Sequence, residues 1–76
     1  MELATRIRKI RESYKFTQAE IASKCEISPS AYGQIERKAG KSSFETLTVI
    51  ATSLGVSLTF LIDITNQNFI EEKNKL

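Results

Sequence analysis

The chain has 76 residues and a formal net charge of +2, with a single cysteine and no histidine. This length suits one small domain and is too short for two, and the composition excludes a disulfide framework or a Cys/His zinc site within one chain. The charge is uneven, because residues 1–43 carry a net +4 and residues 44–76 a net −2. The basic N-terminal part indicates a polyanionic partner.

An amphipathic helix is expected over residues 2–14, and a short second helix near residues 17–25. The first has a mostly basic exposed side, and its apolar residues recur at helical spacing: Leu3, Ile7, Ile10 and Tyr14. Thr17 and Glu20 form a T-x-x-E capping box that starts the second helix. Cys25, at its end, is interpreted as a small core residue rather than a reactive thiol.

A third helix is expected from Pro29 to about Arg37. Ser28 is a favourable N-cap, and proline at the first helical position lacks only an N–H that would have no partner within the helix. About three residues separate the second and third helices. This tight connection predicts a helix-turn-helix, whose second helix can lie in a DNA major groove.

Two further helices follow before the chain becomes polar. Ser43 caps a fourth helix that ends at Gly55. Ser57 caps a fifth, whose apolar residues are Leu58, Leu61, Ile62 and Ile64. Five short helices predict an all-α bundle, with one domain over residues 1–65. Residues 66–76 form a short polar tail, for which one more helical turn and a frayed end both stay open.

The third helix has two different sides. Ala31, Tyr32 and Ile35 share one side and are expected to pack on the first two helices. The opposite side has little bulk beyond proline and consists of Pro29, Ser30, Gly33, Gln34 and Arg37. Small side chains let a helix approach another surface closely, and a glutamine amide can bind adenine bidentately. An ordinary solvated face has a similar composition, which leaves that alternative open.

The pattern R…TQAEIA…IS…QIER…S..TL..IA..LGVS…LI extends over roughly residues 3–64. In this pattern the chain resembles the lambda-repressor-like (XRE-type) helix-turn-helix family. The resemblance implies a five-helix DNA-binding domain with double-stranded DNA as the partner. It also implies that Pro29, Ser30, Gly33 and Gln34 contact bases, and that Gln18 binds a phosphate and braces the third helix.

The resemblance implies further roles outside the third helix. Arg11 and Glu36 match the family's ion pair between the first helix and the end of the third, which we expect to be a partly buried bridge rather than two surface charges. The remaining phosphate contacts are expected from Thr17, Arg37, Lys38, Lys41, Ser42 and Ser43. For Ser43, helix capping is the more certain role, and a solvated Lys41 is an alternative.

The chain departs from the family at three turns where glycine is common, since it has Lys15, Glu26 and Lys38 there. If these positions need a positive φ, each non-glycine residue is strained by about 1 kcal/mol or more. We expect Gly40 to take the turn that Lys38 cannot.

The function expected from these features is a sequence-specific transcriptional regulator, a repressor that acts as a homodimer on a two-fold operator. Phe60, with Phe69 and Ile70, is expected to cover the partner subunit, although Phe60 packed within its own subunit is the alternative. An antitoxin, a restriction-modification controller and a protein-interaction module without DNA binding stay open as other functions.

The sequence also indicates several activities and partners that the chain is not expected to have. Without histidine and with one aspartate, the chain offers no convincing nucleophile and base, so we expect no enzyme, no metal, no cofactor and no small-molecule effector site. No stretch approaches the ~20 apolar residues of a membrane span, and the first residues lack the apolar run of a secretory signal. We therefore expect a cytoplasmic protein without a membrane partner.

Overall fold

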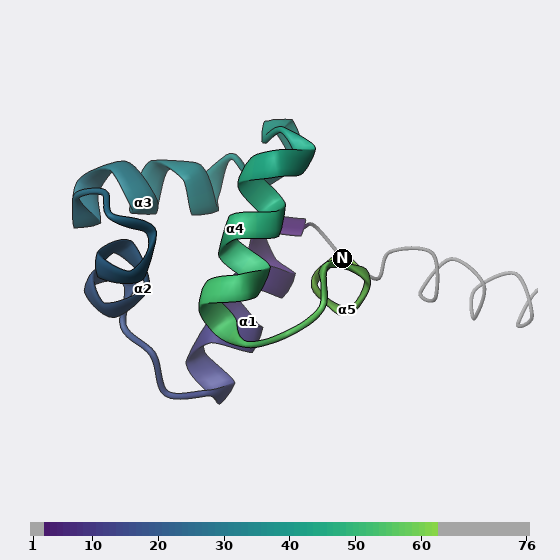
Figure 1. Ribbon diagram of the computed structural model, residues 1–76, viewed down its shortest axis with the longest axis horizontal. Coiled ribbons are helices and arrows are strands. Elements are labelled where there is room, and N and C mark those ends of the chain that lie inside the picture. The colour runs from purple at the N-terminus through teal and green to yellow at the C-terminus, as the bar shows by residue number, and fades with distance from the viewer. Residues whose placement is uncertain (1–2, 63–76) are drawn as a thin grey trace, which may run out of the picture.

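The computed structural model describes residues 3–62, which fold into five α-helices and one 3-10 turn without any strand (Figure 1). The elements are α1 (Leu3–Ser13), α2 (Gln18–Cys25), α3 (Pro29–Arg37), η1 (Ala39–Lys41), α4 (Phe44–Leu54) and α5 (Leu58–Leu61). The predicted all-α fold is confirmed. Ile64, the tail over residues 66–76, and with it Phe69 and Ile70, lie outside the described residues.

Four of the helices begin at the hydroxyl residues that the sequence indicates. The side chains of Thr17, Ser28, Ser43 and Ser57 each accept a hydrogen bond from the backbone N–H three residues further on. At α2 the capping box is complete, because the Glu20 carboxylate also accepts a bond of 2.7 Å from the Thr17 N–H. Each side chain satisfies a backbone donor that has no partner within the helix. The predicted starts are confirmed.

The helix ends differ from expectation at one of the three unusual turns. Lys15 and Glu26 have φ values of 64° and 62°, so both occupy the left-handed region without being glycine. Lys38 has a φ of −106° and is unstrained. Gly40 does not take a left-handed turn in its place, which corrects the expectation. The chain instead continues from α3 into η1, a tighter coil that any L-residue can adopt.

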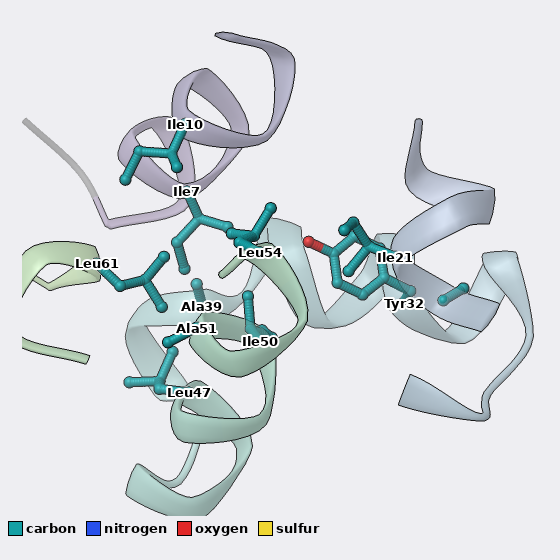
Figure 2. Close-up of a cluster of buried hydrophobic side chains, with 11 residues drawn as sticks. Ile7, Ile10, Ile21, Tyr32, Ala39, Leu47, Ile50, Ala51, Leu54 and Leu61 are labelled. Atoms are coloured by element: carbon teal, nitrogen blue, oxygen red, sulfur yellow. The ribbon is translucent and has the colours of Figure 1, made fainter. Parts of the chain in front are cut away.

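The core contains side chains from all five α-helices and from η1 (Figure 2). Ile7, Ile21, Tyr32, Ile50 and Leu61 are its largest fully buried members. Two expectations are wrong here, because Ala31 is exposed and Tyr14 is 47% exposed. Ala39 in η1 is fully buried instead, since η1 packs against α1. Cys25 is half-buried and packs against the core.

The short helix α5 is held in place by a side chain of α1. Arg6 Nε donates hydrogen bonds of 3.1 Å to the carbonyl oxygens of Phe60 and Leu61. The same guanidinium lies over the Phe60 ring, 5.1 Å from its centroid. A helix this short leaves its last carbonyls without partners within the helix, so a cation at this end supplies donors and a favourable charge.

The strained turn after α2 generates a prediction about stability. Glu26→Gly should raise the free energy of unfolding by about 0.5–1 kcal/mol, since the ~1–2 kcal/mol cost of a left-handed L-residue exceeds the entropy that glycine loses on folding. Glu26→Ala keeps the strained left-handed turn and should not raise the free energy of unfolding. Lys38→Gly should not raise it either, because position 38 has a negative φ. Urea unfolding of the three variants checks this, and equal gains at positions 26 and 38 would contradict it.

Candidate nucleic-acid interface

Helices α2 and α3 form the predicted helix-turn-helix. Residues 26–28 connect them, and α3 lies along one edge of the molecule with its outer side uncovered by other helices (Figure 1). Four residues of the outer stripe are exposed: Pro29, Ser30, Gln34 and Arg37. The side chains that could meet a major groove therefore stand together on one helix face.

Gly33 is the member of this stripe that differs from expectation, because it is buried. A Cβ built on Gly33 would lie 3.5 Å from both Arg37 Nη1 and Gln18 Oε1. The side chains of Gln18 and Arg37 therefore both cover the glycine. These distances are ordinary van der Waals contacts, so the small residue makes room for the two polar side chains without being sterically required.

Beneath the outer stripe, α1 and α3 are joined by a buried ion pair. Arg11 Nε donates a hydrogen bond of 2.8 Å to Glu36 Oε2, and Arg11 Nη2 donates one of 3.2 Å to Oε1. The third nitrogen, Nη1, donates to the Phe16 carbonyl oxygen at 2.8 Å. Arg11 is 7% and Glu36 3% exposed, so both charges are largely removed from water. The fork geometry of this pair restricts both the distance and the orientation of the two helices.

Two more donors reach the same carboxylate. The Tyr32 hydroxyl donates to Glu36 Oε2 at 2.8 Å, and Gln18 Nε2 donates to Oε1 at 3.1 Å. We call Arg11, Gln18, Tyr32 and Glu36 the buried polar cluster. Sequence reasoning assigned Tyr32 only to packing and so missed its hydrogen bond. The available signal was its spacing, since residues 32 and 36 are one helical turn apart.

The pKa values of the cluster follow from these contacts. Burial by itself would raise the pKa of Glu36, but the hydrogen bonds from Arg11, Tyr32 and Gln18 outweigh it and hold that pKa below its ordinary value. The pKa of Arg11 is raised, chiefly by the hydrogen bond that its guanidinium donates to Glu36. Burial, and then the bond to Glu36, raise the pKa of Tyr32. The cluster therefore keeps a charged Arg11–Glu36 pair and a neutral phenol.

The residues expected to contact phosphates have different surroundings. Thr17 and Ser43 use their hydroxyl oxygens as helix caps, and Ser43 Oγ also lies 3.0 Å from Thr46 Oγ1. Ser42 is half-buried at the end of η1. Arg37, Lys38 and Lys41 are exposed at the end of α3 and in η1. Exposed cations thus follow the C-terminal end of α3, and the two hydroxyl caps lie at the N-termini of α2 and α4.

Residues 3–62 lack two other kinds of feature. None of these helices is long and apolar enough to cross a bilayer. Nor does this part of the chain bring together three or more His, Cys, Asp or Glu residues that could hold a metal ion.

The fold and this face define a helix-turn-helix domain, and comparison with known sequences agrees. The chain belongs to the lambda-repressor-like (XRE-type) helix-turn-helix family, because a sequence profile described as "Helix-turn-helix" matches residues 7–61.

Two curated relatives are similar over most of the chain. An uncharacterized HTH-type transcriptional regulator of Bacillus subtilis, YobD, is 30% identical over 71 residues, which is 91% of this chain and 63% of that protein. The immunity repressor protein of Bacillus phage phi105 is 34% identical over 62 residues, 82% of this chain and 43% of that protein. The chain thus spans less than two thirds of each relative's length. No solved structure matches the chain with significance.

The buried polar cluster generates a prediction about stability and its pH dependence. Tyr32→Phe should lower the free energy of unfolding by about 1.5–3 kcal/mol at neutral pH, because it removes a hydrogen bond to a buried charged group. The native pKa of Glu36 is lowered, so the cluster's contribution is present above the unfolded value of about 4.3 and is lost as pH falls through the native value. The effect of Tyr32→Phe should therefore shrink in acid.

Tyr14→Phe is the matched control, since this ring is 47% exposed. It should change the free energy of unfolding by less than about 0.5 kcal/mol at any pH. Urea unfolding between pH 7 and pH 2.5 measures both variants. An effect of Tyr32→Phe that is independent of pH would show that its hydroxyl does not act through the Glu36 carboxylate.

Proposed function

We propose that the chain is a sequence-specific DNA-binding transcriptional regulator, a repressor that places α3 in the major groove of a two-fold operator. The observation that carries the proposal is the exposed stripe of Pro29, Ser30 and Gln34 on a helix whose inner side is tied into the buried polar cluster. Gln34 is the longest neutral side chain of the stripe, and its amide can pair with the N6 and N7 positions of adenine. Pro29 and Ser30 are small and allow the helix to approach the bases closely, while Gly33 leaves room beside them for the Gln18 and Arg37 side chains.

The phosphate contacts proposed around α3 are those of Thr17, Gln18, Arg37, Lys38, Lys41, Ser42 and Ser43. Gln18 is suited to this role because its amide has two N–H donors and Glu36 accepts from the amide nitrogen at 3.1 Å. The second N–H then remains for a phosphate oxygen, with the amide held in one orientation. The backbone N–H groups at the start of α4, which Ser43 caps, offer further donors to an anion.

The names of the two relatives support transcriptional regulation, and one of them supports repression. One is described as an HTH-type transcriptional regulator and the other as an immunity repressor. Both are longer than the matched region, so their activities as whole proteins are carried over to this chain only as a proposal.

The proposed assembly is a homodimer that pairs through α5. Phe60 is 45% exposed even though Arg6 lies over one face of its ring. Its remaining apolar surface can pack against the same surface of a second subunit. Pairing at α5 would place the two copies of α3 about 34 Å apart, which is one turn of B-DNA. Phe69 and Ile70 are proposed to extend this interface.

Base recognition by Gln34 is tested on the preferred DNA site, selected from a random library. Gln34→Ala should weaken binding to that site by about 1–3 kcal/mol and have a much smaller effect on random DNA, because only a base contact distinguishes sequences. Lys38→Ala is the comparison variant and should weaken both DNAs by similar factors. Mobility shifts measure all four affinities. Equal losses of Gln34→Ala on both DNAs would refute base recognition, and no preferred site would refute the proposed function.

The α5 interface is tested by the molecular mass in solution. Phe60→Glu should give a folded monomer with weaker operator binding, because a carboxylate in the apolar interface is desolvated while the neighbouring Arg6 tolerates it within the subunit. Phe44→Glu is the matched control, since this ring is 67% exposed at the first turn of α4. Light scattering without DNA should show that Phe44→Glu remains a dimer. A dimer of unchanged mass for Phe60→Glu would exclude the α5 surface.

A further inference from the structure

Two surface hollows lie between α1 and the segment formed by the end of α3 and η1. The first, of about 260 Å³, is lined by Leu3, Ala4, Arg37, Lys38, Gly40 and Lys41. The second, also of about 260 Å³, is lined by Ala4, Thr5, Arg8, Glu36 and Arg37. They share Ala4 and Arg37 and so adjoin one another. We refer to the two together as the α1 groove.

The walls of the α1 groove are strongly basic. Four cations line it: Arg8, Arg37, Lys38 and Lys41. Its one acidic residue is Glu36, whose charge is already paired with Arg11 in the buried polar cluster. Among residues 3–62 that is the only ion pair, so none of the four cations is paired with a carboxylate of this range. Charges of one sign along a concave surface concentrate the field and attract an anion.

The shape of the groove suits an extended anion rather than a compact one. Ala4, Thr5 and Gly40 are small, and nothing lies within 4 Å of a Cβ built on Gly40. The cations therefore border an open channel, which runs from Arg8 on α1 past Arg37 to Lys41 in η1. A chain of phosphodiesters presents charge at regular intervals along such a path, whereas a small anion would use only part of it.

The groove is continuous with the outer face of α3 through one side chain. Arg37 lines both hollows, and its Nη1 also lies 3.5 Å from the Cβ position of Gly33 on the outer stripe. A DNA duplex that seats its major groove on α3 would thus have a backbone strand close to this side of the domain. The polyanion that best matches the groove is that strand.

We propose that the α1 groove binds the phosphodiester backbone of the DNA strand beside α3, and that Arg8 is a phosphate contact. Neither the helix-turn-helix motif nor the caps point to Arg8, which in the sequence is one of several cations on a solvated helix side. The inference rests on the proposed function and deepens it, because it extends the DNA contact surface from the helix-turn-helix and η1 to the first half of α1.

The neighbouring Lys9 provides a matched control on the same helix. Lys9 is also exposed, but it lines a different hollow, together with Arg6, Ile10 and Ser13. Arg8→Gln and Lys9→Gln therefore remove the same charge from adjacent positions that face different surfaces. Because both side chains are exposed, neither change is expected to disturb folding, which circular dichroism checks.

The test measures affinity for the preferred site and for random DNA across a salt series. Each phosphate contact contributes about 0.9 to the slope of log K against log salt, so Arg8→Gln should reduce the slope by ~1 per subunit on both DNAs. Lys9→Gln should leave the slope unchanged. Arg8→Lys should restore the slope, since a lysine can also neutralise a phosphate.

The outcomes separate this proposal from the proposed function. If wild type prefers its selected site but Arg8→Gln and Lys9→Gln have the same slope, then Arg8 contacts no phosphate and the α1 groove proposal is overturned. If Arg8→Gln affects only the selected site, Arg8 acts on bases, which also overturns it. A wild type that binds no DNA would overturn both proposals together.

Discussion

The rest of the structure depends on the carboxylate of Glu36. It accepts hydrogen bonds from Arg11 on α1, Gln18 on α2 and Tyr32 on its own helix. Burying a carboxylate is costly unless it is paired and hydrogen-bonded, and here both oxygens have partners. No buried polar side-chain atom among the described residues lacks a hydrogen bond. The satisfied cluster therefore restricts the arrangement of the three helices, and with it the orientation of the outer face of α3.

The cluster also links the inside of the domain to its proposed DNA surface. Gln18 donates to Glu36 and also covers Gly33, as does Arg37. Groups that discriminate bases need a rigid support, since small displacements weaken directional hydrogen bonds. Contacts to phosphates are less demanding, because they are largely electrostatic. The exposed cations at the end of α3 and in η1 suit that second role.

Three arginines of α1 have three different surroundings. Arg11 is buried against Glu36, Arg6 binds the carbonyl end of α5, and Arg8 lines the α1 groove. Position 6 lies on a different side of the helix from positions 8 and 11, which are three residues apart and neighbour one another but reach different surroundings. One short helix thereby joins the core, the proposed dimer surface and the proposed DNA surface.

The sequence by itself determined the helices and most of their ends, because caps such as Thr17, Ser28 and Ser43 act on backbone groups only three residues away. The family pattern added the Arg11–Glu36 pairing and the candidate site residues. Only the tertiary structure decided that Gly33 is covered by Gln18 and that Ala31 is exposed while Ala39 is buried. These features depend on side chains brought together from different helices, and helical periodicity gives the direction of a side chain without its neighbours.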